Sequence, residues 1–249
     1  MGAKRVGNKL LWVDEVTSTN VHMSQLKDSN AQHGVVVAAR NQTQGRGQRG
    51  NSWESESGKN LLFSVLLKPT FLAVQHQFLV SKISSLAVVD LLSEVVPNTT
   101  IKWPNDIYVR DNKIAGILIE NSFSSANLDT TIVGVGLNVN QKFFSDSLPN
   151  PTSLILETGT KFNIPSLLEK FCGYFELRYQ QLKAGNIKQI SHEYFSNLYR
   201  NVGFNRYLSD GEEFYACIVG VRDTGTLILE TKKEGELKEF AFKEVSFVL

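Results

Sequence analysis

The chain has 249 residues, 42% of them hydrophobic, so it can bury a large core and carry a small second domain. Its 26 Lys and Arg are balanced by 25 Asp and Glu, which excludes the strongly basic surface of a general nucleic-acid binder. The N-terminus lacks the apolar core of a signal peptide, no apolar run approaches membrane-spanning length, and Cys172 and Cys217 are isolated, which together predict a cytoplasmic protein with reduced thiols and no membrane partner.

The first third of the chain predicts three strands around a glycine-rich loop. Residues 10–16 read as a strand, and a short helix follows as far as Leu26. Residues 34–39 and 61–67 are apolar runs typical of buried strands, and the loop between them contains the sequence GRGQRG. This loop brings Arg46 and Arg49, whose guanidinium groups suit carboxylates and phosphates, next to glycines that allow close backbone approach.

The GRGQRG loop also matches the spacing of a dinucleotide-binding fingerprint, but its context excludes that function. A strand follows where a helix should begin, and no Asp or Glu occurs between Glu56 and Asp90 to bind a ribose. A phosphate-binding P-loop fails for a similar reason, because Asn51-Ser52 replaces the Lys-Ser/Thr pair. From the loop alone, an anion-binding loop and a simple solvated loop both remain open.

The middle of the chain predicts a long core helix and three strands. Helical spacing runs from His76 to Val96, and strand patterns cover residues 99–103, 107–120 and 130–139, with a hairpin turn at residues 111–112. Between the first two strand patterns lies the sequence KWPND, in which Pro104 ends a strand and gathers polar residues at a strand end. Lys113 follows beside small residues, where a buried ammonium group requires an anion, although an exposed lysine remains an alternative.

The last third predicts two helices and then a small β unit. Helices are expected from Pro165 to about Ala184 and over residues 187–200. After Gly203, strands are expected at residues 213–221, 226–231 and 238–248. We therefore predict an α+β fold, with a mixed and largely antiparallel sheet in residues 1–203 and a small C-terminal barrel or sandwich in residues 204–249.

Five motifs in this order give the chain a resemblance to a known family. They are STN (18–20), QTQGRGQRG (42–50) with Trp53 beyond it, KWPND (102–106), KIAGILIE (113–120) and GVGLNVN (134–140). The set resembles that of the biotin protein ligases and covers about residues 10–140. The resemblance implies a class II synthetase-like catalytic domain followed by an SH3-like barrel. It also implies a two-step reaction, in which biotin and Mg-ATP form biotinyl-5′-AMP and a lysine of a biotin carboxyl carrier domain then takes the biotin.

The same resemblance implies roles for individual residues. It places Arg46, Lys113 and Asp106 in catalysis and makes Asp106 the candidate ligand for Mg²⁺. The implied biotin-binding positions are Ser18, Thr19, Asn20, Gln42, Arg46, Gly47, Gln48, Lys113, Gly116, Gly134 and Gly136. The implied ATP or adenylate contacts are Arg46, Arg49, Trp53, Asn105, Lys113 and Asn138.

Two departures from the family pattern affect these expectations. Gln48 stands where many relatives carry Arg, which puts retention of the adenylate in doubt. The first strand begins about ten residues into the sequence, so we expect no DNA-binding domain of the kind found in bifunctional members. A lipoate or octanoate ligase and a non-catalytic biotin sensor remain alternatives, and both a monomer and a homodimer are compatible with the sequence.

Overall fold

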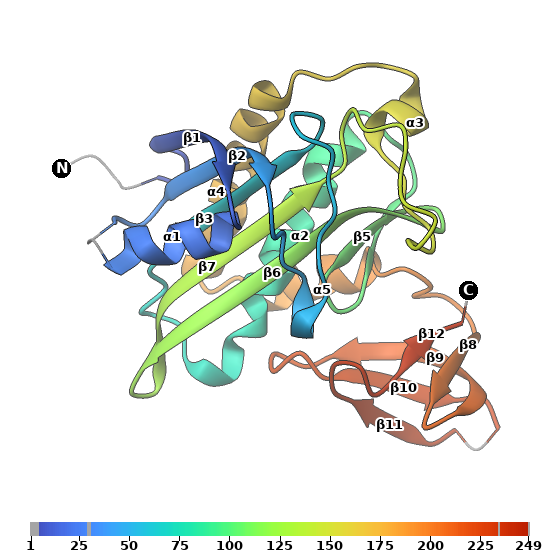
Figure 1. Cartoon of the computed structure of the whole chain (residues 1–249). Coiled ribbons are helices and arrows are strands. Elements are labelled where there is room, and N and C mark those ends of the chain that lie inside the picture. Colours follow the sequence, from blue (N-terminus) through green and yellow to red (C-terminus); the bar gives the residue numbers. More distant parts are fainter. Residues whose placement is uncertain (1–4, 29–30, 234, 249) are drawn as a thin grey trace.

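The main sheet of the protein contains seven strands (Figure 1). The structure, a computed structural model, describes residues 5–28, 31–233 and 235–248, with the side chain of Arg49 outside the described part. In spatial order the strands are β1 (Lys9–Val16), β2 (Val35–Gln42), β3 (Leu61–Leu67), β7 (Asn127–Leu137), β6 (Asn112–Ser124), β5 (Asp106–Val109) and β4 (Thr99–Lys102). Strands β1 and β2 pair in parallel and the other neighbours are antiparallel, which confirms the mixed, largely antiparallel sheet.

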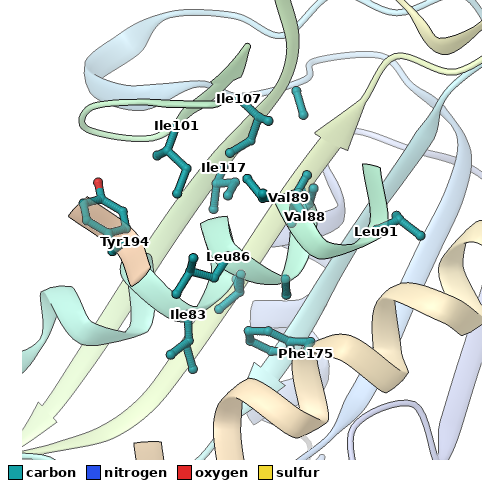
Figure 2. Close-up of a cluster of buried hydrophobic side chains, with 14 of the residues drawn as sticks. Ile83, Leu86, Val88, Val89, Leu91, Ile101, Ile107, Ile117, Phe175 and Tyr194 are labelled. Carbon is teal, nitrogen blue, oxygen red and sulfur yellow. The ribbon is translucent and has the colours of Figure 1, made fainter. Parts of the chain in front are cut away.

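Helices cover both faces of this sheet (Figure 1). The helix α1 (Thr19–Asp28) lies on one face, where Met23 packs in a small apolar cluster with residues of β2, β3 and β7. The larger core is on the other face, under α2 (Phe78–Ser93), α4 (Ile164–Lys183) and α5 (Ile187–Ser196). Figure 2 shows Ile83 and Leu86 of α2 in that core with Ile117 of β6, close to Phe175 and Tyr194.

The alternation of side chains along the central strands separates the core from the opposite face. In β3, Phe63 and Val65 belong to the large core, while Ser64 between them contacts α1. In β7, Val133 and Val135 enter the core, and the residues between and after them are glycines. Because successive side chains of a strand point to opposite faces, the core side is apolar, and the α1 side presents Ser64 and the glycines next to the small apolar cluster around Met23.

The C-terminal residues form a second, five-stranded antiparallel sheet to the lower right in Figure 1. Its strands, in spatial order, are β11 (Leu237–Phe240), β10 (Leu227–Thr231), β9 (Glu212–Val221), β8 (Asn205–Ser209) and β12 (Ser246–Phe247). This arrangement agrees with the expected SH3-like unit. The division between residues 203 and 204 stays a prediction, and β8 begins just after it.

Residues of the turn between β9 and β10 make polar contacts between the C-terminal unit and the rest of the protein. The indole Nε1 of Trp103 donates to the carbonyl of Gly225 at 2.8 Å. The Asp223 carboxylate lies 2.8 Å from Nζ of Lys82, which is only 1% exposed in α2, and 3.0 Å from Nδ1 of His76. The C-terminal unit is thus held to the helical layer by an ion pair that is buried at Lys82, and the ring of Phe242 packs against that of Phe78 in α2.

Most of the predicted elements are confirmed, with differences at their ends. The long helix stops at Ser93, so Val95 is an exposed residue and not a core residue as its spacing suggested. The hairpin turn falls one residue earlier, at Arg110 and Asp111, where Arg110 takes the left-handed conformation. The sequence patterns missed the helix α3 (Leu154–Thr158) and the strand β8, and they merged β11 with β12. No helix in the described part of the chain is long and apolar enough to cross a membrane.

Candidate active site

A cleft of about 490 Å³ opens on the α1 face of the main sheet, at its junction with the C-terminal unit. It is lined by residues of all five predicted motifs, including Ser18, Thr19, Asn20, Gln42, Arg46, Gly47, Gln48, Trp53, Asn105, Asp106, Lys113, Gly116, Gly134 and Gly136. These residues come from segments up to about half the chain apart in sequence. The structure therefore brings nearly all of the sequence-predicted site residues into one place.

The floor of the cleft is made of glycines. Gly116 of β6 pairs with Gly136 of β7, and Gly134 lies two residues before it on the same face. A Cβ atom at Gly134 would lie 2.2 Å from Oδ1 of Asn20, so a side chain there would collide with the pocket wall. At Gly116 and Gly136 a Cβ would lie 2.9 and 2.5 Å from the indole of Trp53. The floor therefore admits a flat or ring-shaped group directly against the sheet.

A network of neutral polar groups forms one end of the cleft. The Oε1 atom of Gln42 accepts from the backbone N–H of Thr19 at 2.7 Å and from its hydroxyl at 3.0 Å. The hydroxyl of Ser64 lies 2.8 Å from that of Thr19 and 2.6 Å from Oδ1 of Asn20. The amide of Asn20 then donates to Glu120 at 2.8 Å. Each side chain is held by another, so this end presents fixed amide and hydroxyl groups.

Charged side chains line the rest of the cleft, and one ion pair borders the neutral network through Glu120. Nζ of Lys113 lies 2.8 Å from Oδ1 of Asp106, and Nη1 of Arg46 lies 3.1 Å from Oε1 of Glu120. Lys113 reaches Asp106 because β5 and β6 pair next to each other at the end of KWPND. Both ion pairs are partly exposed, so an incoming anion can exchange with their carboxylates.

The glycine loop, residues 43–60, covers the cleft as a small hairpin. The backbone N–H of Trp53 donates to Gly45 at 2.9 Å, and that of Gly47 donates to Asn51 at 2.7 Å. The one-turn 3₁₀ helix η1 (Gln48–Gly50) forms the tip. Arg46 and Gln48 of this hairpin line the same cleft as the glycine floor.

The side chain of Trp53 packs on that floor, against Gly116 and Gly136. Its Nε1 is buried and has no hydrogen-bond partner among the described residues. Nζ of Lys113 lies 5.6 Å from the centre of the ring. The indole thus occupies space that a ligand would otherwise take.

Two predicted residues hold the backbone around the site. The amide of Asn105 donates to the carbonyl of Ile117 at 2.8 Å, which ties KWPND to β6. Asn138 does not line the cleft: its amide donates to the carbonyl of Thr152 at 2.9 Å and fixes the loop beyond β7. The predicted contact of Asn138 with a nucleotide therefore has no support from its position, and the side chain of Arg49 lies outside the described residues.

The sequence patterns missed several residues that line the cleft or support its lining residues. Glu120 and Ser64 could have been found from strand alternation, since Glu120 shares a face with Gly116, and Ser64 is the one polar residue in an apolar strand. The C-terminal unit adds Phe242, Lys243, Val245, Ser246 and Phe247 to the lining. No local signal predicts this wall, because it depends on how the two units pack.

Comparison with known proteins agrees with this arrangement. The sequence model of the Biotin/lipoate A/B protein ligase family matches residues 12–138, about half of the chain and all five motifs except the last residues of the fifth. The chain belongs to this family. Within the family, it is 31% identical over 235 residues to the Bifunctional ligase/repressor BirA of Bacillus subtilis, covering 92% of this chain and 71% of that protein.

Other members of the ligase family show the same likeness. The Biotin–[acetyl-CoA-carboxylase] ligase of Mycobacterium tuberculosis is 33% identical over 160 residues, which are 62% of this chain and 58% of that one. The solved biotin protein ligase of Aquifex aeolicus in complex with biotin and ATP superposes with a TM-score of 0.79 at 29% identity, covering 96% of this chain and 98% of that one. The family fold thus extends over both units of the chain.

Proposed function

We propose that the chain is an ATP-dependent biotin–[acetyl-CoA-carboxylase] ligase. It forms biotinyl-5′-AMP from biotin and ATP and then transfers biotin to a lysine of a biotin carboxyl carrier domain. The observation that carries the proposal is that one cleft joins a neutral amide and hydroxyl pocket over a glycine floor to the side chains of Arg46 and Lys113. The first end suits the uncharged rings of biotin and the second suits the anions that must react.

The first step must bring two negatively charged groups together. A carboxylate oxygen of biotin attacks the α-phosphorus of ATP, the bond to the β-phosphate breaks and pyrophosphate leaves. Two like charges about 4 Å apart repel by about 4 kcal/mol at an effective dielectric constant near 20. Arg46 and Lys113 offset this repulsion and stabilise the charge that develops at the α-phosphate.

Recognition of the acid is assigned to the neutral end of the cleft. Ser18, Thr19, Asn20 and Gln42 surround the ring system, while Gly116, Gly134 and Gly136 let it lie against the sheet. Trp53, Arg49 and Asn105 remain proposed adenylate residues. Gln48 offers a neutral amide at the loop tip, and we expect it to hold the adenylate less tightly than a guanidinium group would.

Mg²⁺ fits the site as a companion of ATP. Among the described residues no three His, Cys, Asp or Glu side chains gather as a metal site, but Mg²⁺ commonly binds one or two carboxylates together with substrate phosphates. Asp106 is the carboxylate in the cleft that would hold it. When bound, Mg²⁺ neutralises phosphate charge.

The second step requires a neutral amine. The carrier lysine attacks the carbonyl carbon of the adenylate and AMP leaves, but an unperturbed lysine pKa near 10.4 keeps this amine mostly protonated. We assign Asp106 to accepting or orienting that proton. The partner is a carrier domain of acetyl-CoA carboxylase or a related enzyme, and we place the reaction in the cytoplasm, with the ligase acting as a monomer or a homodimer.

The proposal is tested by pyrophosphate release from Mg-ATP without an acceptor protein, in the presence of biotin, lipoate, octanoate or no acid. Release that depends on biotin is the expected result. Release with lipoate or octanoate but not biotin would make the chain a ligase for those acids. If biotin binds but no acid elicits release, the chain is better described as a sensor.

A further inference from the structure

Glu120 is a charged residue beside the cleft that contacts two of the lining residues, and the proposed reaction gives it no role. It lies on β6, four residues after Gly116 and on the same face. Its two carboxylate oxygens contact different parts of the protein: Oε2 accepts from Nδ2 of Asn20 at 2.8 Å, and Oε1 lies 3.1 Å from Nη1 of Arg46. One side chain therefore connects the neutral pocket to the glycine loop.

The contact with Asn20 fixes the direction in which that amide points. Asn20 is 2% exposed, and its Oδ1 faces the hydroxyl of Ser64 at 2.6 Å. Its Nδ2 has the carbonyl of Leu118 at 3.4 Å and Glu120 at 2.8 Å, so Glu120 is the closer acceptor. Gly134 leaves only enough room for the Asn20 side chain. A change at Glu120 therefore acts directly on the wall of the pocket.

The contact with Arg46 fixes the glycine loop. Arg46 lies at the stem of the loop hairpin, where it bridges to Ser52. Pairing through Nη1 leaves the Nε and Nη2 donors of the guanidinium available to oxygen atoms in the cleft. Ion pairs between partly exposed groups are weak, so the loop can open while Glu120 keeps its contact with buried Asn20.

We infer that Glu120 is a positioning residue that couples the acid pocket to closure of the glycine loop. Occupation of the pocket holds Asn20 and Glu120 in place, and the second oxygen of Glu120 then holds Arg46 over the reacting groups. This inference rests on the proposed function, because it assigns the pocket to an organic acid. A carboxylate is required, since only two equivalent acceptor oxygens can serve both donors.

The test compares Glu120→Gln with the wild-type chain. Glutamine has nearly the same shape but replaces one acceptor with an amide N–H₂, so it can keep only one of the two contacts. The first readout is the rate of trypsin cleavage after Arg46, with and without biotin. The second is pyrophosphate release, separated into kcat and the KM for biotin. Glu239→Gln, which disrupts an exposed Arg–Glu pair with Arg222 in the C-terminal sheet, is the matched control.

We expect biotin to protect the wild-type loop and the control, and to protect Glu120→Gln about tenfold less, with a similar fall in kcat. A purely structural role for Glu120 would lower the melting temperature without changing the ratio of cleavage rates with and without biotin. Glu120→Ala removes both contacts without adding a donor, and it serves as the second variant if the glutamine protein misfolds. We expect the same loss of protection from it.

Two outcomes would overturn the coupling. One is biotin protection and kcat at wild-type levels in both Glu120 variants. The other is a wild-type loop that biotin, lipoate and octanoate all fail to protect. If the proposed function is wrong but the coupling is right, the two readouts separate. Biotin, lipoate or octanoate would then still protect the loop from trypsin through Glu120, but no pyrophosphate would be released.

Discussion

Lys113 shows how a single residue acquires its role from its surroundings. Its ammonium group lies 2.8 Å from Asp106 and faces the ring of Trp53, and it lines the same cleft as Arg46. The pair is about one-third exposed at the lysine, so its contribution to folding is small, under about 1 kcal/mol. The position of the Lys113 ammonium group therefore serves the binding of an anionic ligand more than the stability of the fold.

We therefore expect Lys113→Ala to slow adenylate formation by about 100- to 1,000-fold with little change in the melting temperature. The measurement is single-turnover formation of AMP-linked product from biotin and ATP. Lys170→Ala, which removes a comparable exposed ion pair with Glu94 far from the cleft, should leave the rate unchanged. Equal rates in wild type and Lys113→Ala would mean that the site is misplaced.

Among single residues, the sequence correctly predicted those site residues that lie within short, contiguous motifs. Lys113, Arg46 and the STN residues all reach the cleft. Asn138 belongs to the GVGLNVN motif but turns its amide toward Thr152, because β7 ends at Leu137. Glu120 went unassigned because its importance comes from two partners that are distant in sequence.

Among the elements, the β6–β7 hairpin combines core packing with ligand space. Its core face carries Ile117, Val133 and Val135, and its site face carries Gly116, Gly134 and Gly136. Bare glycines on one face are tolerated because the other face is fully packed. The same two strands thus stabilise the fold and leave room for a ligand.

Gly134→Ala should raise the KM for the acid at least tenfold. The new methyl group would lie 2.2 Å from Oδ1 of Asn20, and the overcrowding should also lower the free energy of unfolding by about 1 to 3 kcal/mol. Acid binding and urea unfolding measure the two effects.

Gly173→Ala is the matched control for Gly134→Ala. Apart from its chain neighbours and the nearby backbone of its own helix, no described atom lies within 4 Å of a Cβ at Gly173 in the interior of α4, so alanine should raise the free energy of unfolding by up to about 1 kcal/mol. Acid binding should be unchanged in this variant. Tight binding in Gly134→Ala would show that Asn20 can move aside without loss.

Element prediction succeeded where the periodicity was long and failed where tertiary contacts decide. The helix α4 was predicted to within a residue or two because Pro165 and Gly185 mark its ends. The strand β8 was missed since its five residues carry a short and partly polar pattern. The helix α3 is only five residues long and is held by the loop that follows β7.

For the whole molecule, the junction between the two sheets depends on a buried charge. Burial disfavours ionisation of Asp223, but the hydrogen bond and charge of Lys82, with help from His76, outweigh it and place the pKa of Asp223 below its ordinary value of 3.8. Lys82 is almost fully buried, and its other partners are the hydroxyl of Ser191 and the carbonyl of Val221. Without Asp223, its charge would have no compensating carboxylate among the described residues.

Asp223→Asn should therefore lower the free energy of unfolding by about 3 kcal/mol. Adding Lys82→Met should recover part of this loss, because an apolar side chain of similar size removes the uncompensated charge. Urea unfolding of the two variants gives both numbers. A double variant as unstable as Asp223→Asn alone would contradict this account of the junction.

The lowered pKa of Asp223 also fixes the sign of a pH effect. The stabilisation by its carboxylate is fully present above pH 3.8 and is lost as the pH falls through the lower pKa of the folded state. Wild type should lose this part of its stability in acid, while Asp223→Asn should not. Urea unfolding at several pH values between neutrality and pH 3 measures this effect, and the free energies of unfolding of wild type and Asp223→Asn should approach each other as the pH falls.

The position of Trp53 has a thermodynamic consequence. Since the indole lies on the glycine floor, the protein itself supplies an occupant for that surface. Binding there is an exchange, and the measured affinity is the difference between what the incoming group gains and what the indole gives up. If a second ligand offers the displaced indole a new apolar surface, the free energy needed to displace the indole for the first ligand becomes smaller. Two substrates would then bind cooperatively without any rearrangement of the sheet.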